Sequence, residues 1–166
     1  MNSYILKIFL YETDPQVWRR FSVPETATFS ELHQIIQKAM GWNDEQAHQF
    51  RYGKGRHLKQ VIANTNEQVG PGDEFTDEKD ITIAQFAGRR KLPVRLMYRY
   101  DFFDDWTHEL VIEEKRKVRT RLRCWAANEP ARQRTAEDPS ATRSVLLAML
   151  SGWTMITIQR PLTRDR

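Results

Sequence analysis

The sequence predicts an α+β fold, and three observations support this. Two pairs of segments are rich in β-branched and aromatic residues and alternate in polarity, as half-buried β-strands do. One segment repeats its apolar residues at three- and four-residue spacing, as an amphipathic helix does. The chain has 166 residues, 40% of them hydrophobic, which is the size of one ordinary domain. We therefore expect a single α+β domain over residues 1–160 and a disordered basic tail over residues 161–166.

The first pair of strands is predicted at the N-terminus. Residues 4–11 and residues 17–23 both have strand-like composition, and the second segment ends before Pro24. A turn at Asp14 and Pro15 separates them. The simplest pairing of the two segments is an antiparallel hairpin.

The clearest helix follows this hairpin. Thr28 is an N-cap residue, and Glu31, three residues later, completes a capping box. Gly41 supplies a left-handed stop. The apolar residues between them lie on one helical face and predict packing against a sheet: Leu32, Ile35, Ile36, Ala39 and Met40.

The middle of the chain is less regular. We expect a strand over residues 46–52, a polar loop over residues 53–80 and a short helix over residues 80–86 capped by Asp80. A loop as long as the one over 53–80 is either mobile or functional.

A second hairpin is predicted from two alternating segments, residues 92–102 and residues 106–114. The order strand, strand, helix, strand, short helix, strand is that of a β-grasp, in which one main helix lies across a mixed sheet. We expect this β-grasp-like core over residues 4–114. A C-terminal extension over residues 115–160 is expected to add a helix up to Leu150 and a last strand.

Three features of the sequence indicate the cellular compartment of the protein. The longest apolar run has six residues, far fewer than the roughly 20 that cross a bilayer, so we expect no membrane association. The N-terminus lacks the pattern of a secretory signal. The single cysteine, Cys124, excludes an internal disulfide. These features favour a cytoplasmic protein.

Charge is unevenly distributed. Residues 67–80 contain six acidic side chains and one lysine, whereas residues 115–134 contain eight basic side chains and one glutamate. Both runs are ordinary for solvated surface segments. The alternative is a nucleic-acid-binding face, for which the candidate residues are Lys115, Arg116, Lys117, Arg119, Arg121 and Arg123.

The motifs of the common nucleotide-binding and hydrolase classes are absent from the sequence, which favours a non-enzymatic role. Polar side chains do gather at the second hairpin, where Asp101 can approach His108 across the strands and orient its imidazole. The alternative is that Asp105 and its neighbours are ordinary turn residues. The wider candidate cluster is His33, His48, Asp101, Asp105 and His108.

A metal ion is one ligand that this cluster suggests. His33 lies at the edge of the apolar helical stripe, where its side chain can face sideways. Together with His48 and the carboxylates it offers the ligand types that hold Zn²⁺ or Mn²⁺. A metal-dependent hydrolase is therefore an alternative function, although the spacing of these residues does not require a metal.

Four stretches of the chain combine several rare residues: Pro15-x-Val-Trp-Arg-Arg, Leu32-His-x-x-Ile-Gln-x-Ala-Met-Gly-Trp42, His48-x-Phe50 and Tyr98-x-Tyr-Asp-Phe-x-Asp-x-Trp-x-His108. Through these stretches the sequence resembles the plasmid pRiA4b ORF-three-like family over residues 4–114. Members of this family are also described as passenger proteins of insertion elements. The resemblance implies an α+β domain of bacteria and mobile elements, with no particular activity.

The chain departs from that family at two places. Relatives usually carry glycine where this chain has Phe103, so the turn geometry is expected to differ. They also carry a cysteine-rich segment where this chain has Cys124 alone, which argues against a metal site completed by that segment. The leading expectation is a non-enzymatic protein-binding or adaptor module that presents its sheet edges and the segment 53–80 to a protein partner.

Overall fold

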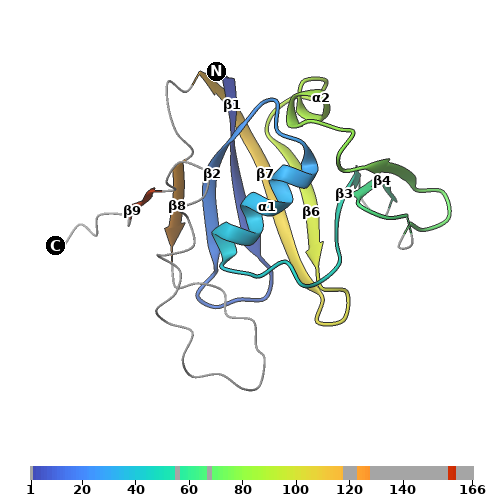
Figure 1. The fold of residues 1–166 in the computed structure, drawn as a ribbon, viewed down its shortest axis with the longest axis horizontal. Coiled ribbons are helices and arrows are strands. Elements are labelled where there is room, and N and C mark those ends of the chain that lie inside the picture. Colours follow the sequence, from blue (N-terminus) through green and yellow to red (C-terminus); the bar gives the residue numbers. More distant parts are fainter. Residues whose placement is uncertain (1, 55–56, 67–68, 118–122, 128–156, 160–166) are drawn as a thin grey trace.

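The computed structural model describes residues 2–54, 57–66, 69–117, 123–127 and 157–159. Figure 1 shows a large twisted sheet with one helix lying on its face. The elements in chain order are β1 (Asn2–Leu10), β2 (Trp18–Pro24), α1 (Phe29–Met40), β3 (His48–Lys54), β4 (His57–Ala63), β5 (Glu74–Asp77), α2 (Ile83–Ala87), β6 (Val94–Tyr100), β7 (Trp106–Lys117), β8 (Arg123–Ala127) and β9 (Thr157–Gln159).

The described strands form one nine-stranded sheet in the order β5-β4-β3-β6-β7-β1-β2-β8-β9. Strand β1 pairs with β2 on one side and with the long β7 on the other, both antiparallel. The parallel pairs lie at the two edges, between β4 and β5 and between β8 and β9. Both predicted hairpins, β1 with β2 and β6 with β7, are confirmed.

The expected β-grasp-like architecture is wrong. A β-grasp sheet has a parallel pair of strands at its centre, whereas the centre of this sheet is antiparallel throughout. The sheet also dominates the fold, because the two described helices have only 12 and 5 residues. The expected C-terminal helix lies outside the described residues, and so do most of residues 115–160 and the tail over 161–166.

The polar segment 53–80 is not a loop, because β4 and β5 form within it. In β4, Val61, Ile62 and Ala63 are all buried. Consecutive buried residues lack the polar and apolar alternation that predicted the other strands, so β4 was not predicted. The strand is defined by its neighbours in the sheet, because β4 pairs with β3 on one edge and with β5 on the other.

Helix α1 forms as its sequence predicts. The Thr28 hydroxyl accepts a hydrogen bond from the Glu31 amide, the Glu31 carboxylate accepts one from the Thr28 amide, and Gly41 ends the helix with φ 80°. The short helix α2 is capped by Thr82, not by Asp80, through the same kind of box with Gln85.

The main core lies between α1 and one face of the sheet. Phe29, Leu32, Ile36 and Met40 of α1 are fully buried against alternate residues of the central strands. These strand residues include Leu6, Ile8, Phe21, Phe50, Leu96, Tyr98, Leu110 and Ile112. His33 and Gln37 are buried on the same helix, so the polar site described below is set directly into this core.

Neither of the described helices is long and apolar enough to span a membrane.

Candidate functional site

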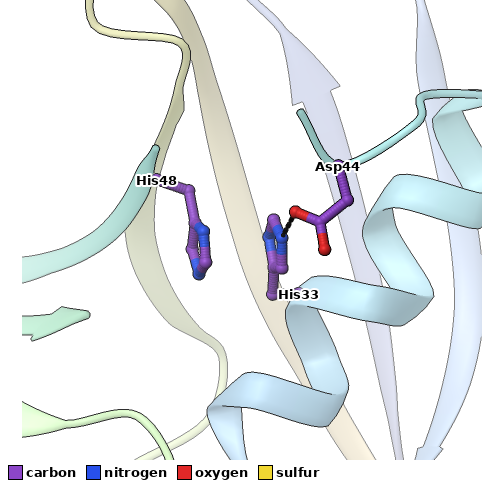
Figure 2. A group of neighbouring side chains, drawn as sticks. All are labelled: His33, Asp44 and His48. Atoms are coloured by element: carbon purple, nitrogen blue, oxygen red, sulfur yellow. Dashed lines mark hydrogen bonds and ion pairs between the residues drawn. The ribbon is translucent and has the colours of Figure 1, made fainter. Parts of the chain in front are cut away.

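A polar group interrupts the core between α1, β3 and the loop that joins them. His33 of α1 is only 2% exposed, and its Nε2 lies 2.5 Å from Oδ1 of Asp44. Its Nδ1 lies 2.9 Å from the hydroxyl of Tyr98, which projects from β6. Figure 2 shows the His33 ring standing between Asp44 and the ring of His48.

Two groups of fixed role set the direction of the hydrogen bonds around His33: a backbone amide, which only donates, and the Asp44 carboxylate, which only accepts. The amide of Asp44 is a donor and bonds the side-chain oxygen of Gln37 at 3.0 Å, so the Gln37 amide group donates to the Tyr98 oxygen. Because the ionised Asp44 carboxylate only accepts, a neutral His33 carries its proton on Nε2, and its Nδ1 therefore accepts from the Tyr98 hydroxyl. The chain of donors therefore ends on a carboxylate.

A second histidine and carboxylate pair lies beside the first. Nε2 of His48, at the start of β3, is 2.6 Å from Glu78, and both side chains are 4% exposed. The His33 and His48 rings are stacked, with 3.3 Å between centroids and 2° between planes. The order across the site is therefore carboxylate, imidazole, imidazole, carboxylate.

The surroundings shift the ionisation of these groups. Burial lowers the pKa of His33, and the neighbouring His48 lowers it further. Burial favours a higher pKa for Asp44 and for Glu78, but hydrogen bonds from the histidines hold the pKa of both carboxyls below its usual value. Burial also raises the pKa of Tyr98 well above its usual value. At neutral pH a neutral His33 and a neutral Tyr98 thus face two ionised carboxylates.

Of the five residues in the candidate cluster, the structure brings only His33 and His48 together. The Asp101 carboxylate accepts hydrogen bonds from the amides of Phe103 and Asp104, within its own turn. Asp105 pairs with Arg99 and with the Thr107 hydroxyl on the surface. Both residues have a left-handed backbone, with φ 57° and 53°, which suits a turn function.

His108 does not form the expected pair with Asp101. It lies opposite Tyr98 in the sheet and is fully buried, with Nδ1 3.3 Å from the Tyr98 carbonyl oxygen. Its ring meets Trp42 edge to face at 5.2 Å, and Nε2 has no hydrogen-bond partner in the part of the chain that the structure describes. Burial lowers its pKa to about 4, so His108 is a neutral core residue.

Sequence reasoning missed Asp44, Glu78 and Tyr98. Asp44 follows the helix stop as an ordinary loop residue, and Glu78 belongs to an acidic run that reads as solvated surface. Neither carries a local signal, because its role depends on a histidine 11 or 30 residues away. The β-strand alternation that places Tyr98 on the core face was the one usable clue.

A second feature lies at one end of the sheet, where β3 begins and β6 ends. Residues 11–17, 41–47 and 101–105 meet there, through bonds from the Tyr11 amide to the Thr107 carbonyl and from the Asp101 amide to the Ala47 carbonyl. We call these three segments the acidic end. They contain no lysine or arginine and seven carboxylates: Glu12, Asp14, Asp44, Glu45, Asp101, Asp104 and Asp105.

The acidic end also exposes aromatic side chains. Phe103 is 97% exposed and Tyr11 is 47% exposed. Phe102, by contrast, lies beside Arg99, whose guanidinium carbon is 5.2 Å from the ring centroid. The turn therefore presents one free phenyl ring among carboxylates.

The candidate nucleic-acid residues begin at the opposite end of the sheet. Lys115 pairs with Glu25 at 2.6 Å and Arg116 pairs with Glu114 at 2.7 Å, while Lys117 is exposed. Arg119 and Arg121 lie outside the described residues, and of Arg123 the structure describes only the backbone, in β8. Nucleic-acid binding by this run stays a prediction.

A comparison with protein-family models identifies the family. A family model described as Plasmid pRiA4b ORF-3-like protein matches residues 2–146. Uncharacterized protein y4hQ of Sinorhizobium fredii (strain NBRC 101917 / NGR234) is 32% identical over 112 residues, which cover 65% of this chain and 52% of that protein. The chain thus spans about half the length of this curated relative.

A solved structure is also similar. The crystal structure of a protein of unknown function, MM3350 from Methanosarcina mazei Go1, matches with a TM-score of 0.59 and 30% identity, over 74% of this chain and 67% of that one. The family resemblance seen in the sequence is therefore confirmed. The chain belongs to the plasmid pRiA4b ORF-3-like protein family.

Proposed function

We propose that this chain is a protein-binding module whose acidic end docks a lysine- and arginine-rich segment of a partner protein. The observation that carries the proposal is the 97% exposure of Phe103 at the tip of the β6–β7 turn. Large apolar side chains at protein surfaces gain free energy when a partner covers them, and aromatic anchors dominate many interfaces.

The turn holds Phe103 in place. The carboxylate of Asp101 accepts the amides of Phe103 and Asp104 at 3.0 and 3.3 Å, and the Asp105 amide donates to the Asp101 carbonyl at 2.7 Å. Arg99 and Thr107 fix Asp105 from the flanking strands. A preformed loop loses little conformational freedom on binding, which favours affinity.

Charge selects the class of partner. The seven carboxylates of the acidic end are accompanied by no basic residue in the same three segments. Within these strands, Arg99 is the basic side chain that reaches the turn, and Asp105 already pairs with it. An excess of charge of one sign repels acidic partners and attracts cationic ones, and an arginine guanidinium can also stack on the exposed Phe103 ring.

The proposal is tested with short cationic peptides. We expect a fluorescently labelled peptide rich in arginine and lysine to bind the full chain, with affinity falling as salt rises. A matched peptide with glutamate at every basic position serves as the control and should not bind. Fluorescence anisotropy measures both affinities.

Variants separate docking from general electrostatic attraction. Phe103→Ser should weaken binding of the cationic peptide by roughly fivefold or more, the loss of about 1 kcal/mol expected of an interface anchor. The matched control is Phe75→Ser, since Phe75 is also an exposed phenylalanine, 40% accessible, but lies on β5 at the sheet edge. If both variants bind like the unmodified chain, the docking proposal is wrong.

A further inference from the structure

We propose that His33, Asp44 and His48 bind one divalent transition-metal ion between α1, β3 and the loop that joins them. Each of the three residues offers one ligand atom, and these atoms lie within 4.8 Å of one another. The site shares Asp44 with the acidic end, but the docking function proposed above needs no metal.

The donor set suits such an ion. Two imidazole nitrogens and a carboxylate oxygen are ligands of Zn²⁺ and of similar first-row metals. Charge also balances, because a dication beside the Asp44 and Glu78 carboxylates forms a neutral group. A neutral group of charges is far less costly to bury than an unpaired cation.

The ion takes the position of the proton between His33 and Asp44. Their two atoms, Nε2 and Oδ1, already face one another at 2.5 Å. Ligand atoms at about 2.1 Å from a tetrahedral metal lie roughly 3.4 Å apart, so the pair must open by about 1 Å. Asp44 can move by this amount because its side chain is 36% exposed and lies on a loop.

The neighbouring residues are arranged as supports for metal-bound histidines. Such histidines commonly bond a carboxylate or another polar group through the ring nitrogen that does not hold the metal. Glu78 occupies Nε2 of His48 in this way, which leaves Nδ1 of His48 for the ion. Tyr98 faces Nδ1 of His33, which leaves Nε2 for the ion. When Nε2 holds the ion, the ring proton moves to Nδ1 and is donated to the Tyr98 oxygen, so this hydrogen bond reverses its direction.

Binding requires one rearrangement of the rings. An imidazole donates in its own plane, and the His33 and His48 planes are parallel and 3.3 Å apart between centroids. An ion in the plane of His33 therefore lies out of the plane of His48. The His48 ring turns out of the stack when the ion enters.

The test uses the full chain, freed of metal with a chelator and titrated with Zn²⁺, Mn²⁺ and Co²⁺ by calorimetry. We expect binding of one ion per chain, with Co²⁺ giving the visible absorption of a nitrogen- and oxygen-ligated centre. Asp44→Asn and His48→Gln should each weaken binding at least tenfold. Asp104→Asn, a neutral replacement of an exposed carboxylate in the same acidic end, should bind as the unmodified chain does.

Folding is checked separately from binding. Circular dichroism and thermal melting without metal establish that each variant is folded before its affinity is compared. If the folded chain binds no stoichiometric metal, or if folded Asp44→Asn and His48→Gln bind as tightly as Asp104→Asn, the metal site is rejected.

Discussion

The imidazole rings of His33 and His48 lie face to face, 3.3 Å apart between centroids and within 2° of parallel, although the residues come from α1 and β3. Each ring is anchored at its Nε2 by a carboxylate, His33 by Asp44 and His48 by Glu78. The stack thus joins the helix to the sheet through polar groups at a place where the rest of the interface is apolar. We therefore expect this polar junction to contribute to the stability of the fold.

Removal of the Tyr98 hydroxyl should destabilise the fold. In Tyr98→Phe, Nδ1 of His33 and the side-chain amide of Gln37 lose their shared partner inside the core. An unsatisfied buried polar group costs about 1–3 kcal/mol, so we expect a fall of that size in the free energy of unfolding, measured with urea. Tyr11→Phe removes a hydroxyl from a side chain that is 47% exposed and should change stability by less than about 0.5 kcal/mol. Equal effects in the two variants would contradict the network.

Replacement of the buried carboxylate should also be costly. Glu78→Gln keeps the shape of the side chain but removes the charge that faces Nε2 of His48 at 2.6 Å. Hydrogen bonds to charged groups contribute roughly 1.5–3 kcal/mol, and we expect a loss in this range at pH 7. The control is Glu74→Gln on the exposed part of β5. A variant of Glu78 as stable as that of Glu74 would show that the pair with His48 adds nothing to stability.

Acid should unfold the protein partly through His108. Its pKa falls from the usual 6.5 to about 4 in the fold because the ring is buried. Between these values the unfolded chain binds the proton more readily, so stability is unaffected above pH 6.5 and is lost as pH falls toward 4. The full effect is about 3 kcal/mol.

His108→Gln isolates this contribution, because the glutamine amide can still donate to the Tyr98 carbonyl but does not titrate. Free energies of unfolding measured between pH 7 and pH 4 should fall less steeply in the variant. Asp44 and Glu78 also lose stabilising charge as the pH falls, but they do so equally in both proteins. Parallel pH profiles would exclude His108 as a source of the acid sensitivity.

Phe103→Gly should leave the fold intact. The residues with positive φ in the turn are Asp101 and Asp105, so position 103 does not require glycine. With the side chain 97% exposed, we expect stability to change by less than about 0.5 kcal/mol, as measured by thermal melting. A large loss would mean that Phe103 is held against a part of the chain that the structure does not describe.

Local sequence signals were enough to predict some of the helices and strands and half of the site, namely its two histidines. The capping box at Thr28, the apolar stripe of α1 and the stop at Gly41 lie within 14 residues, and the helix formed as predicted. The two hairpins were predictable for the same reason, since alternation and a turn are local features. His33 was recognised because it lies at the edge of the apolar stripe of α1, and His48 because imidazole is a common metal ligand.

The rest depended on contacts between distant parts of the chain. The antiparallel pairing of β1 with β7 joins residues about 100 positions apart, and this pairing excludes the β-grasp arrangement. Glu78 could be assigned to His48 only once β5 had been placed beside β4. Asp101 and Asp105 were overvalued because a carboxylate that caps its own turn has the same sequence signature as one that serves a site.

The separation of charge along the strands has a consequence for motion in solution. At the end opposite the acidic end, residues 88–93 and 115–117 contain six basic side chains and no acidic one: Arg89, Arg90, Lys91, Lys115, Arg116 and Lys117. Glu25 and Glu114 pair with Lys115 and Arg116 at that end, and the remaining basic side chains still oppose the acidic end. The described part of the chain therefore contributes an electric dipole roughly parallel to β1 and β7. Near a charged partner the field exerts a torque that turns one end of the sheet toward it before contact. Orientation of this kind raises association rates at low ionic strength and fades as salt shortens the range of the field.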